Sequence, residues 1–279
     1  MEEKEIRALV SLLDDNDNEI LKHVENQIFS IGADVIPFLE AQWENSFDSD
    51  LQQRIEQMIH SIQFEDLISK LADWKEEGAE DLFKGMCIVC SYLYPDVDYS
   101  DLSKELEQLY YEVWLEFKYD MHPLDQVKVL NSIFFHKLRF RPNTKNFYAP
   151  NNSMINMVLE TRKGNPISLC VVYLLIAHKL KLPMFGVNLP KQFVLTYKSK
   201  DMQFYISVFN KGLVFSRADI DTHIRQHNLS PSPAFYEPCS TQDIIVRVLR
   251  NLYVSYKELG ETQKMEEILR LVGIVEKNK

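Results

Sequence analysis

The sequence has little glycine, little proline and a shortage of positive charge, and each shortage excludes a class of protein. Only 8 of the 279 residues are Gly and 11 are Pro, which argues against long flexible linkers and low-complexity segments. Acidic residues outnumber basic ones by 41 to 31, so the formal net charge is −10. An acidic surface repels phosphate backbones, and no cluster of Lys and Arg offsets this repulsion. We therefore expect no nucleic-acid partner.

Long apolar runs and cysteines are also scarce. The longest apolar stretch, 167–177, is shorter than the roughly 18 residues that indicate a membrane span. The N-terminal residues are acidic and polar, unlike an export signal. The four cysteines (Cys87, Cys90, Cys170 and Cys239) show no spacing typical of a disulfide framework or a zinc site. We expect a cytoplasmic protein with no membrane partner, no metal and no cofactor.

The N-terminal region is predicted to be helical. Apolar residues recur every three or four positions from residue 4 to about 62, Asp17 can cap a helix and Gly32 can end one. These helices resemble HEAT-type hairpins, and a plain helical bundle fits the pattern equally well, since an array needs about three units. Separate helices are expected over 51–62, 64–74, 81–94 and 100–118.

The pattern changes after the apolar helix at 167–177. An irregular segment, 140–153, precedes a helix over 154–162 that Ser153 can cap. Short β-branched and aromatic runs then predict an antiparallel meander, at 184–188, 192–198, 202–208 and 213–215. On a short helix at 217–227, His223 and His227 are expected to form a satisfied or solvated pair rather than a metal site.

The last predicted element is a helical hairpin. It covers Asp243–Leu259 and Thr262–Val275, with Gly260 at the bend. Its pattern resembles a single tetratricopeptide unit. One such unit is not stable alone, so we expect it to pack on the core or on a partner.

A family resemblance becomes specific between Asn151 and Tyr197. The residues that carry it are Asn152, Ser153, Val158, Leu159, Glu160, Arg162, Lys163, Gly164, Asn165, Pro166, Ile167, Ser168, Leu169, Tyr173, Ala177, Gly186, Val187, Asn188, Leu189, Pro190 and Phe193. Together they resemble the bacterial SirB-type, transglutaminase-like family. The resemblance implies an α+β fold: an all-helical N-terminal region (1–119), a papain/transglutaminase-like core with a small antiparallel sheet (120–238) and a tetratricopeptide-like hairpin packed on the core (239–279).

The resemblance also implies an active site in which the three catalytic residues of the superfamily are replaced. The wider superfamily places a Cys nucleophile at the start of the buried helix, a His on the next strand and an Asp on the strand after it. The matching positions here are Pro166, Gln192 and Ser207. Proline has no side chain that can attack a substrate, and Gln cannot shuttle a proton. The resemblance therefore implies a protein without the family's catalysis.

Cys170 is the alternative nucleophile. It follows Pro166 by four residues and so lies on the same helix face, one turn deeper. There the effect of the helix dipole has faded, and apolar neighbours raise the pKa of a thiol. No His falls in the predicted meander to act as its base. Ser168 lacks a base for the same reason, and its hydroxyl is expected to bond backbone groups in the first turn.

Two functional hypotheses follow, and a purely structural subunit is a third. The leading hypothesis is a non-catalytic interaction or scaffold protein that binds a protein or peptide. Its groove would be lined by neutral hydrogen-bonding groups, namely Asn165, Ser168, Gln192, Ser207 and Asn210. The rival is a cysteine-dependent amide hydrolase or transamidase that uses Cys170. Arg162, Gly164 and Tyr173 are assigned structural roles: Arg162 is expected to bond loop carbonyls, and Gly164 to supply a backbone shape other residues resist.

Overall fold

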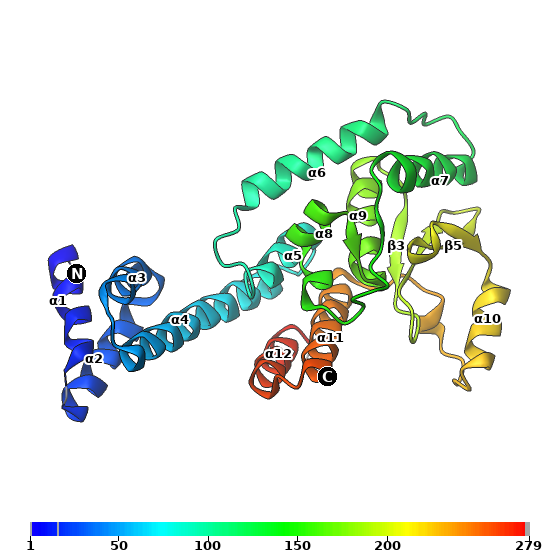
Figure 1. Cartoon of the computed structure of the whole chain (residues 1–279). Helices are drawn as coiled ribbons and strands as arrows, with labels where there is room; N and C mark the ends of the chain where they lie inside the picture. Colours follow the sequence, from blue (N-terminus) through cyan, green and yellow to red (C-terminus); the bar gives the residue numbers. More distant parts are fainter. Residues whose placement is uncertain (1, 16, 277–279) are drawn as a thin grey trace. The chain divides into compact units, whose positions relative to one another are not determined.

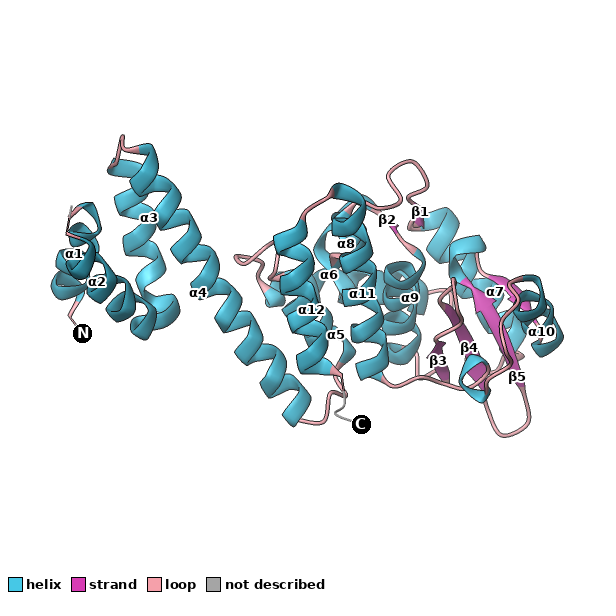
Figure 2. Cartoon of the chain, turned by 90° about the horizontal axis from the view of Figure 1, so that it is seen from below, coloured by secondary structure: helices cyan, strands magenta, loops and turns pink. Residues whose placement is uncertain are grey.

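The chain folds into α-helices followed by a small antiparallel sheet and a final helical hairpin (Figure 1, Figure 2). The computed structural model describes residues 2–15 and 17–276. Tertiary contacts divide the chain into two units, Met1–Lys70 and Leu71–Lys279. The predicted α+β fold class is confirmed. The segments 1–119, 120–238 and 239–279 stay predictions about domain organisation.

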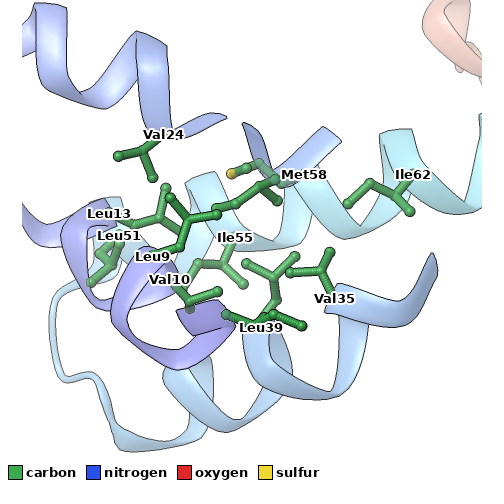
Figure 3. Close-up of a cluster of buried hydrophobic side chains, with 12 residues drawn as sticks. Leu9, Val10, Leu13, Val24, Val35, Leu39, Leu51, Ile55, Met58 and Ile62 are labelled. Atoms are coloured by element: carbon green, nitrogen blue, oxygen red, sulfur yellow. The ribbon is translucent and has the colours of Figure 1, made fainter. Parts of the chain in front are cut away.

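The first unit is a group of helices around one apolar core. Asp17 caps its second helix as predicted, because the carboxylate accepts a hydrogen bond from the Glu19 N–H at 2.8 Å. Gly32 ends that helix with a φ of 75°, a value that favours glycine. Ile55 and Leu39 are fully buried in the core, which Figure 3 shows. The elements are α1 (Glu3–Ser11), α2 (Asn18–Ile31), α3 (Ile36–Asn45) and the first part of α4 (Ser49–Glu76).

The separate helices predicted over 51–62 and 64–74 are wrong. The structure has one continuous helix, α4, from Ser49 to Glu76. The sequence in this range contains neither Gly nor Pro, so nothing in the backbone chemistry ends the helix at the predicted break.

The second unit places its helices before and after the sheet. The sheet has the order β3-β4-β5-β6 with antiparallel neighbours, as the predicted meander requires. Its strands are β3 (Met184–Val187), β4 (Val194–Lys198), β5 (Gln203–Ser207) and β6 (Leu213–Phe215). The helices are α5 (Leu82–Cys90), α6 (Tyr99–Trp114), α7 (Pro123–Ser132), α8 (Ile155–Thr161), α9 (Pro166–Lys179), α10 (Arg217–Gln226), α11 (Thr241–Leu259) and α12 (Thr262–Val275).

Helix α9 is the centre of the second unit. All residues from Ile167 to Ala177 are buried, because the helix is apolar on every side and other elements surround it. It packs against β3 and β4, against α8 and against α11, and Figure 1 shows it running beside β3. Before it, β1 (Arg141–Pro142) and β2 (Lys163–Gly164) form a short parallel pair.

The C-terminal hairpin packs on this core. Gly260 makes the bend between α11 and α12 with a φ of 75°. Helix α11 contacts α5 and α9 as well as α12, and Figure 2 shows α11 beside α9. Val248, Leu249 and Leu252 on α11 are fully buried. In the described part of the chain, no helix combines the length and apolar character needed to cross a membrane.

Candidate functional site

The start of α9 is closed by reciprocal hydrogen bonds. Asn165 is the N-cap, and its Oδ1 accepts from the Ser168 N–H at 2.9 Å. The Asn165 N–H in turn donates to Ser168 Oγ at 3.0 Å. Pro166 follows at the first helical position, where its missing N–H costs little. The start of α9 is therefore a capped helix end whose first residue carries no reactive group, and its match to the nucleophile position stays a prediction.

Asn165 also ties this helix end to the segment before α8. Its Nδ2 donates to Ser153 Oγ at 2.9 Å, and both side chains are buried. The prediction that Ser153 caps α8 is wrong, since Met154 holds the N-cap position without a side-chain bond. The Ser153 hydroxyl is used instead as an acceptor for Asn165. Ser168, 1% exposed, is bonded as predicted and lies below the surface.

Two of the predicted structural roles need correction. Gly164 does not have a positive φ. It is needed for space, because an added Cβ would lie 2.4 Å from Ser168 Oγ. The Arg162 side chain forms an ion pair with Glu105 at 3.1 Å and lies over the Phe140 ring, rather than bonding the predicted loop carbonyls. Tyr173 is structural as predicted: it is fully buried and donates to Asn131 Oδ1 at 2.9 Å.

A pocket of about 140 Å³ opens directly over Asn165 and Pro166. Its remaining walls come from three segments that are far apart in sequence. They are the irregular segment before α8 (Phe147, Tyr148), the loop between β3 and β4 (Lys191, Phe193) and one face of α11 (Arg247, Asn251, Val254, Ser255). The fold thus assembles a pocket at the start of α9 from segments that are far apart in the sequence.

The irregular segment is a packed loop, as predicted from its length and composition. Asn152 is buried, and its Nδ2 donates to the carbonyls of Asn146 and Phe147 at 2.7 and 2.9 Å. Its Oδ1 accepts from Asn143 Nδ2 at 2.8 Å. These bonds fix the backbone beneath Phe147 and Tyr148, so the aromatic wall of the pocket is held in place.

The charged side chains that line the pocket are Lys191 and Arg247. Arg247 is partly buried, and its Nη1 donates to Asn188 Oδ1 at 3.0 Å. Burial, together with the nearby positive charge of Arg250, lowers the pKa of Arg247. Lys191 is exposed and has a φ of 63°. The described residues put no carboxylate into the pocket lining.

The predicted groove residues do not all meet in this pocket. Asn165 lines it, as does Pro166 from the vacant triad, whereas Gln192 and Ser207 do not. Gln192 is partly buried in the loop between β3 and β4. Ser207 lies at the end of β5, where its Oγ accepts from Asn210 Nδ2 at 2.9 Å. The triad positions Gln192 and Ser207 stay predictions, since they rest on register alone.

Sequence reasoning missed the contributions of the aromatic pair and of α11. Phe147 and Tyr148 are adjacent in a segment already singled out as irregular and aromatic. On α11, Arg247, Asn251 and Ser255 follow one another at four-residue intervals and therefore share one helix face. That row of polar residues on one face of α11 was the available signal.

Cys170 lies beneath the pocket and has no access to it. Its side chain is fully buried, and its Sγ donates to the Phe193 carbonyl at 3.6 Å. Burial raises the pKa of the thiol well above its usual range. Two imidazoles of the second unit bond to backbone carbonyls: His178 Nε2 lies 2.9 Å from the Met184 oxygen, and His223 Nε2 lies 3.0 Å from the Pro190 oxygen.

The remaining cysteines and histidines have structural surroundings. Cys87 and Cys90 are buried on α5, and Cys90 Sγ donates to Asn156 Oδ1 at 3.0 Å. The rings of His223 and His227 lie 4.2 Å apart, and each ring bonds a backbone carbonyl. No group of three or more His, Cys, Asp or Glu side chains in the described ranges is placed to hold a metal ion.

A capped, buried helix followed by an antiparallel meander, with a pocket over the helix start, is the arrangement of a transglutaminase-like core. The chain belongs to the transglutaminase-like superfamily, whose family model matches residues 100–250. The chain is 31% identical over 191 residues to a UPF0162 protein of Xylella fastidiosa (strain 9a5c), covering 64% of this chain and 67% of that one.

Two further relatives differ in how much of their length is matched. The UPF0162 protein YchA of Escherichia coli (strain K12) is 30% identical over 203 residues, covering 72% of this chain and 74% of that protein. F-box only protein 21 of Homo sapiens is 28% identical over 145 residues, covering 49% of this chain and 23% of that protein. No solved structure matches the chain.

Proposed function

We propose that this chain is a non-catalytic, SirB-type member of the superfamily that binds a protein or peptide partner through the pocket at the start of α9. The observation that carries the proposal is that Pro166, which we assign to the nucleophile's position, is the first residue of α9 and lines the pocket. The superfamily's binding place is retained while its reactive side chain is replaced. Location in the cytoplasm, without a nucleic-acid or membrane partner, belongs to the same proposal. It rests on the cysteines without framework spacing, the acidic composition and the short apolar runs.

The lining of the pocket supports a peptide as the ligand. Phe147, Tyr148 and Phe193 provide apolar area, and the amides of Asn165 and Asn251 can bond to a peptide group. A volume of about 140 Å³ suits one or two side chains rather than a large cofactor. The pocket also borders α11, which belongs to the tetratricopeptide-like hairpin.

The rival function is a cysteine-dependent amide hydrolase or transamidase that uses Cys170. It requires a thiolate that reaches the substrate and a base that accepts the thiol proton. The buried sulfur, bonded to the Phe193 carbonyl, and its raised pKa both speak against this function.

Selection of peptides on the full chain tests the binding proposal. A displayed library of random peptides is panned against the wild-type protein and against Val254→Arg, which places a bulky charge at the pocket wall. The matched control is Leu259→Arg, because Leu259 is also exposed on α11 but does not line the pocket. We expect enriched peptides that bind wild type and Leu259→Arg and lose binding to Val254→Arg. Enriched peptides that bind all three proteins equally would contradict a role for the pocket.

Assays of enzymatic activity and of cysteine labelling test the rival function, an amide hydrolase or transamidase that uses Cys170. The protein is incubated with glutamine-containing peptides and a primary amine, and release of ammonia and incorporation of the amine are measured. We expect neither, and we expect iodoacetamide at neutral pH to leave Cys170 unmodified in the native protein. Turnover that disappears in Cys170→Ser would establish the enzyme and overturn the non-catalytic assignment.

A further inference from the structure

The pocket over α9 has the opposite charge to the rest of the protein. The chain has a formal net charge of −10, yet the charged residues at this pocket are the cations Lys191 and Arg247. Charges of one sign in a concave site attract a ligand of the other sign and raise its local concentration. The local charge therefore predicts an anionic group on whatever binds there.

A bound anion is expected to stabilise Arg247 more than it would stabilise an arginine on the surface. It is partly buried, and it donates a hydrogen bond to the neutral Oδ1 of Asn188. Its neighbour Arg250 is paired with Glu276, so that carboxylate serves the other cation. Among the described residues, Arg247 has no ion pair with a carboxylate. A partly desolvated cation without a counter-ion is costly, and a bound anion would remove that cost.

Lys191 is held close to the mouth of the pocket by its loop. The preceding residue, Pro190, has its carbonyl bonded by His223 Nε2 at 3.0 Å. Lys191 itself adopts a left-handed backbone, which is unusual for a residue with a side chain. The loop backbone is thus fixed from the α10 side, and the ammonium group is exposed beside Phe193.

The start of α9 lacks the free backbone N–H groups that usually bind a phosphate. Phosphates usually bind at helix N-termini through free backbone N–H groups. Here Pro166 has no N–H, and the Ser168 N–H already donates to Asn165 Oδ1. Side chains are therefore the main donors at this helix start, and a guanidinium fork with one lysine fits a planar monoanion.

We infer that the pocket recognises a carboxylate on its peptide partner, with Arg247 and Lys191 as the recognising cations and an apolar or aromatic side chain of the partner against Phe147 and Phe193. This inference specifies the ligand of the proposed function and rests on it. The carboxylate can come from a peptide's C-terminus or from an Asp or Glu side chain. Both sources offer the same two oxygens to Arg247.

A pair of small probes tests the inference without a known partner. N-acetyl-4-fluorophenylalanine has a free carboxylate beside an aromatic ring, and its amide has the same shape without the charge. Binding of each to the full chain is measured by fluorine NMR. We expect the acid to bind about tenfold more tightly than the amide, as the loss of one charge-assisted hydrogen bond predicts. Equal binding of acid and amide overturns the inference.

Variants of lysine and arginine residues test which side chains cause the preference for the acid probe over its amide. Lys191→Met should remove most of the preference for the acid. Lys211→Met is the control, since Lys211 is also an exposed lysine with a left-handed backbone (φ 56°) but does not line the pocket. Arg247→Lys keeps the charge and removes the fork, so it should weaken acid binding while the protein stays folded. Acid binding that survives both Lys191→Met and Arg247→Lys contradicts the assignment.

Peptides and inorganic anions separate the sources of the anion. Peptides from the library selection are compared with a free or amidated C-terminus, and with Asp and Glu replaced by Asn and Gln. Dependence on the first change identifies a C-terminal carboxylate, and dependence on the second identifies an acidic side chain. Inorganic phosphate that displaces the acid probe better than acetate does would overturn the carboxylate in favour of a phosphate ligand.

The two proposals fail in different ways. If peptides bind at the pocket with no preference for a carboxylate, the carboxylate inference fails and the peptide-binding function stands. If no peptide is enriched on wild type but the acid probe binds in a Lys191-dependent manner, the anion site stands and the peptide-binding function fails.

Discussion

At the scale of single residues, Gly164 is a position where the fold leaves no room for a side chain. A Cβ there would lie 2.4 Å from Ser168 Oγ and 3.3 Å from side-chain carbons of Val158 and Leu169. Ser168 cannot turn away, because its hydroxyl is buried and bonded to the Asn165 N–H. We expect Gly164→Ala to lower the free energy of unfolding by about 2–3 kcal/mol, a typical cost of overpacking, measured by urea denaturation.

A second glycine provides the control for this prediction. Gly273 lies within α12, and nothing lies within 4 Å of an added Cβ. Gly273→Ala should therefore stabilise the protein by about 0.5–1 kcal/mol, since alanine has the higher helix propensity. Combining Gly164→Ala with Ser168→Ala should recover part of the loss, because the clashing oxygen is gone. No recovery would mean that the cost of Gly164→Ala arises elsewhere.

Sequence reasoning identifies Gly164 as special but assigns the wrong physical cause. A glycine in a turn suggests a positive φ, and only coordinates distinguish that cause from a close approach. The burial of Cys170 could be predicted from the sequence alone, because a helix that is apolar on all sides places its thiol in the core whatever its neighbours are. The place of Arg247 in the pocket could not be predicted. It depends on the distance between the start of α9 and α11, which are about 80 residues apart in the chain.

At the scale of elements, the first turn of α9 depends on its connection to the segment before α8. Asn165 accepts from the Ser168 N–H and donates to Ser153 Oγ, so one side chain serves two elements. We expect Asn165→Ala to cost about 2 kcal/mol through the lost cap and the lost buried bond. Ser153→Ala should cost about 1 kcal/mol, because it leaves one amide hydrogen of Asn165 unsatisfied.

A double-mutant cycle tests whether these two side chains act together. The free energies of unfolding are measured for both single variants and for the double variant. Because both mutations break the same bond, the double variant should cost about 1 kcal/mol less than the sum of the single variants. Asn210→Ala is the control, since that exposed side chain bonds only Ser207 at the far end of β5. Additive losses at Asn165 and Ser153 would show that the two elements are held by other contacts.

The elements that could be predicted are those whose signals are local. The meander follows from short β-branched runs separated by turns, and the final hairpin follows from Gly260 and the two amphipathic helices. The wrong break in α4 and the wrong cap at Ser153 have another origin. Helix α4 continues because the range contains neither Gly nor Pro, and the Ser153 hydroxyl is used by a tertiary contact with Asn165 in place of a cap.

At the scale of the whole chain, the division at Lys70 and Leu71 predicts two unfolding units with separate cores. The sequence did not reveal this division, because helical periodicity continues across it and no linker composition marks it. Ile55 and Leu39 belong to the apolar core of the first unit and Leu249 to that of the second, and all three are fully buried. A core mutation should therefore act on the unit that contains it.

Ile55→Ala tests this division. The truncation should destabilise residues 3–62 by about 2–4 kcal/mol, the usual cost of a buried Ile-to-Ala change. Amide hydrogen exchange should become faster in α1, α2 and α3 while α9 and α11 keep their protection, since local unfolding follows cooperative units. Leu249→Ala is the counterpart and should produce the reverse pattern. Acid-probe binding should stay unchanged in Ile55→Ala, because the pocket residues all lie between 147 and 255. Faster exchange throughout the chain in both variants would mean that the two units unfold as one.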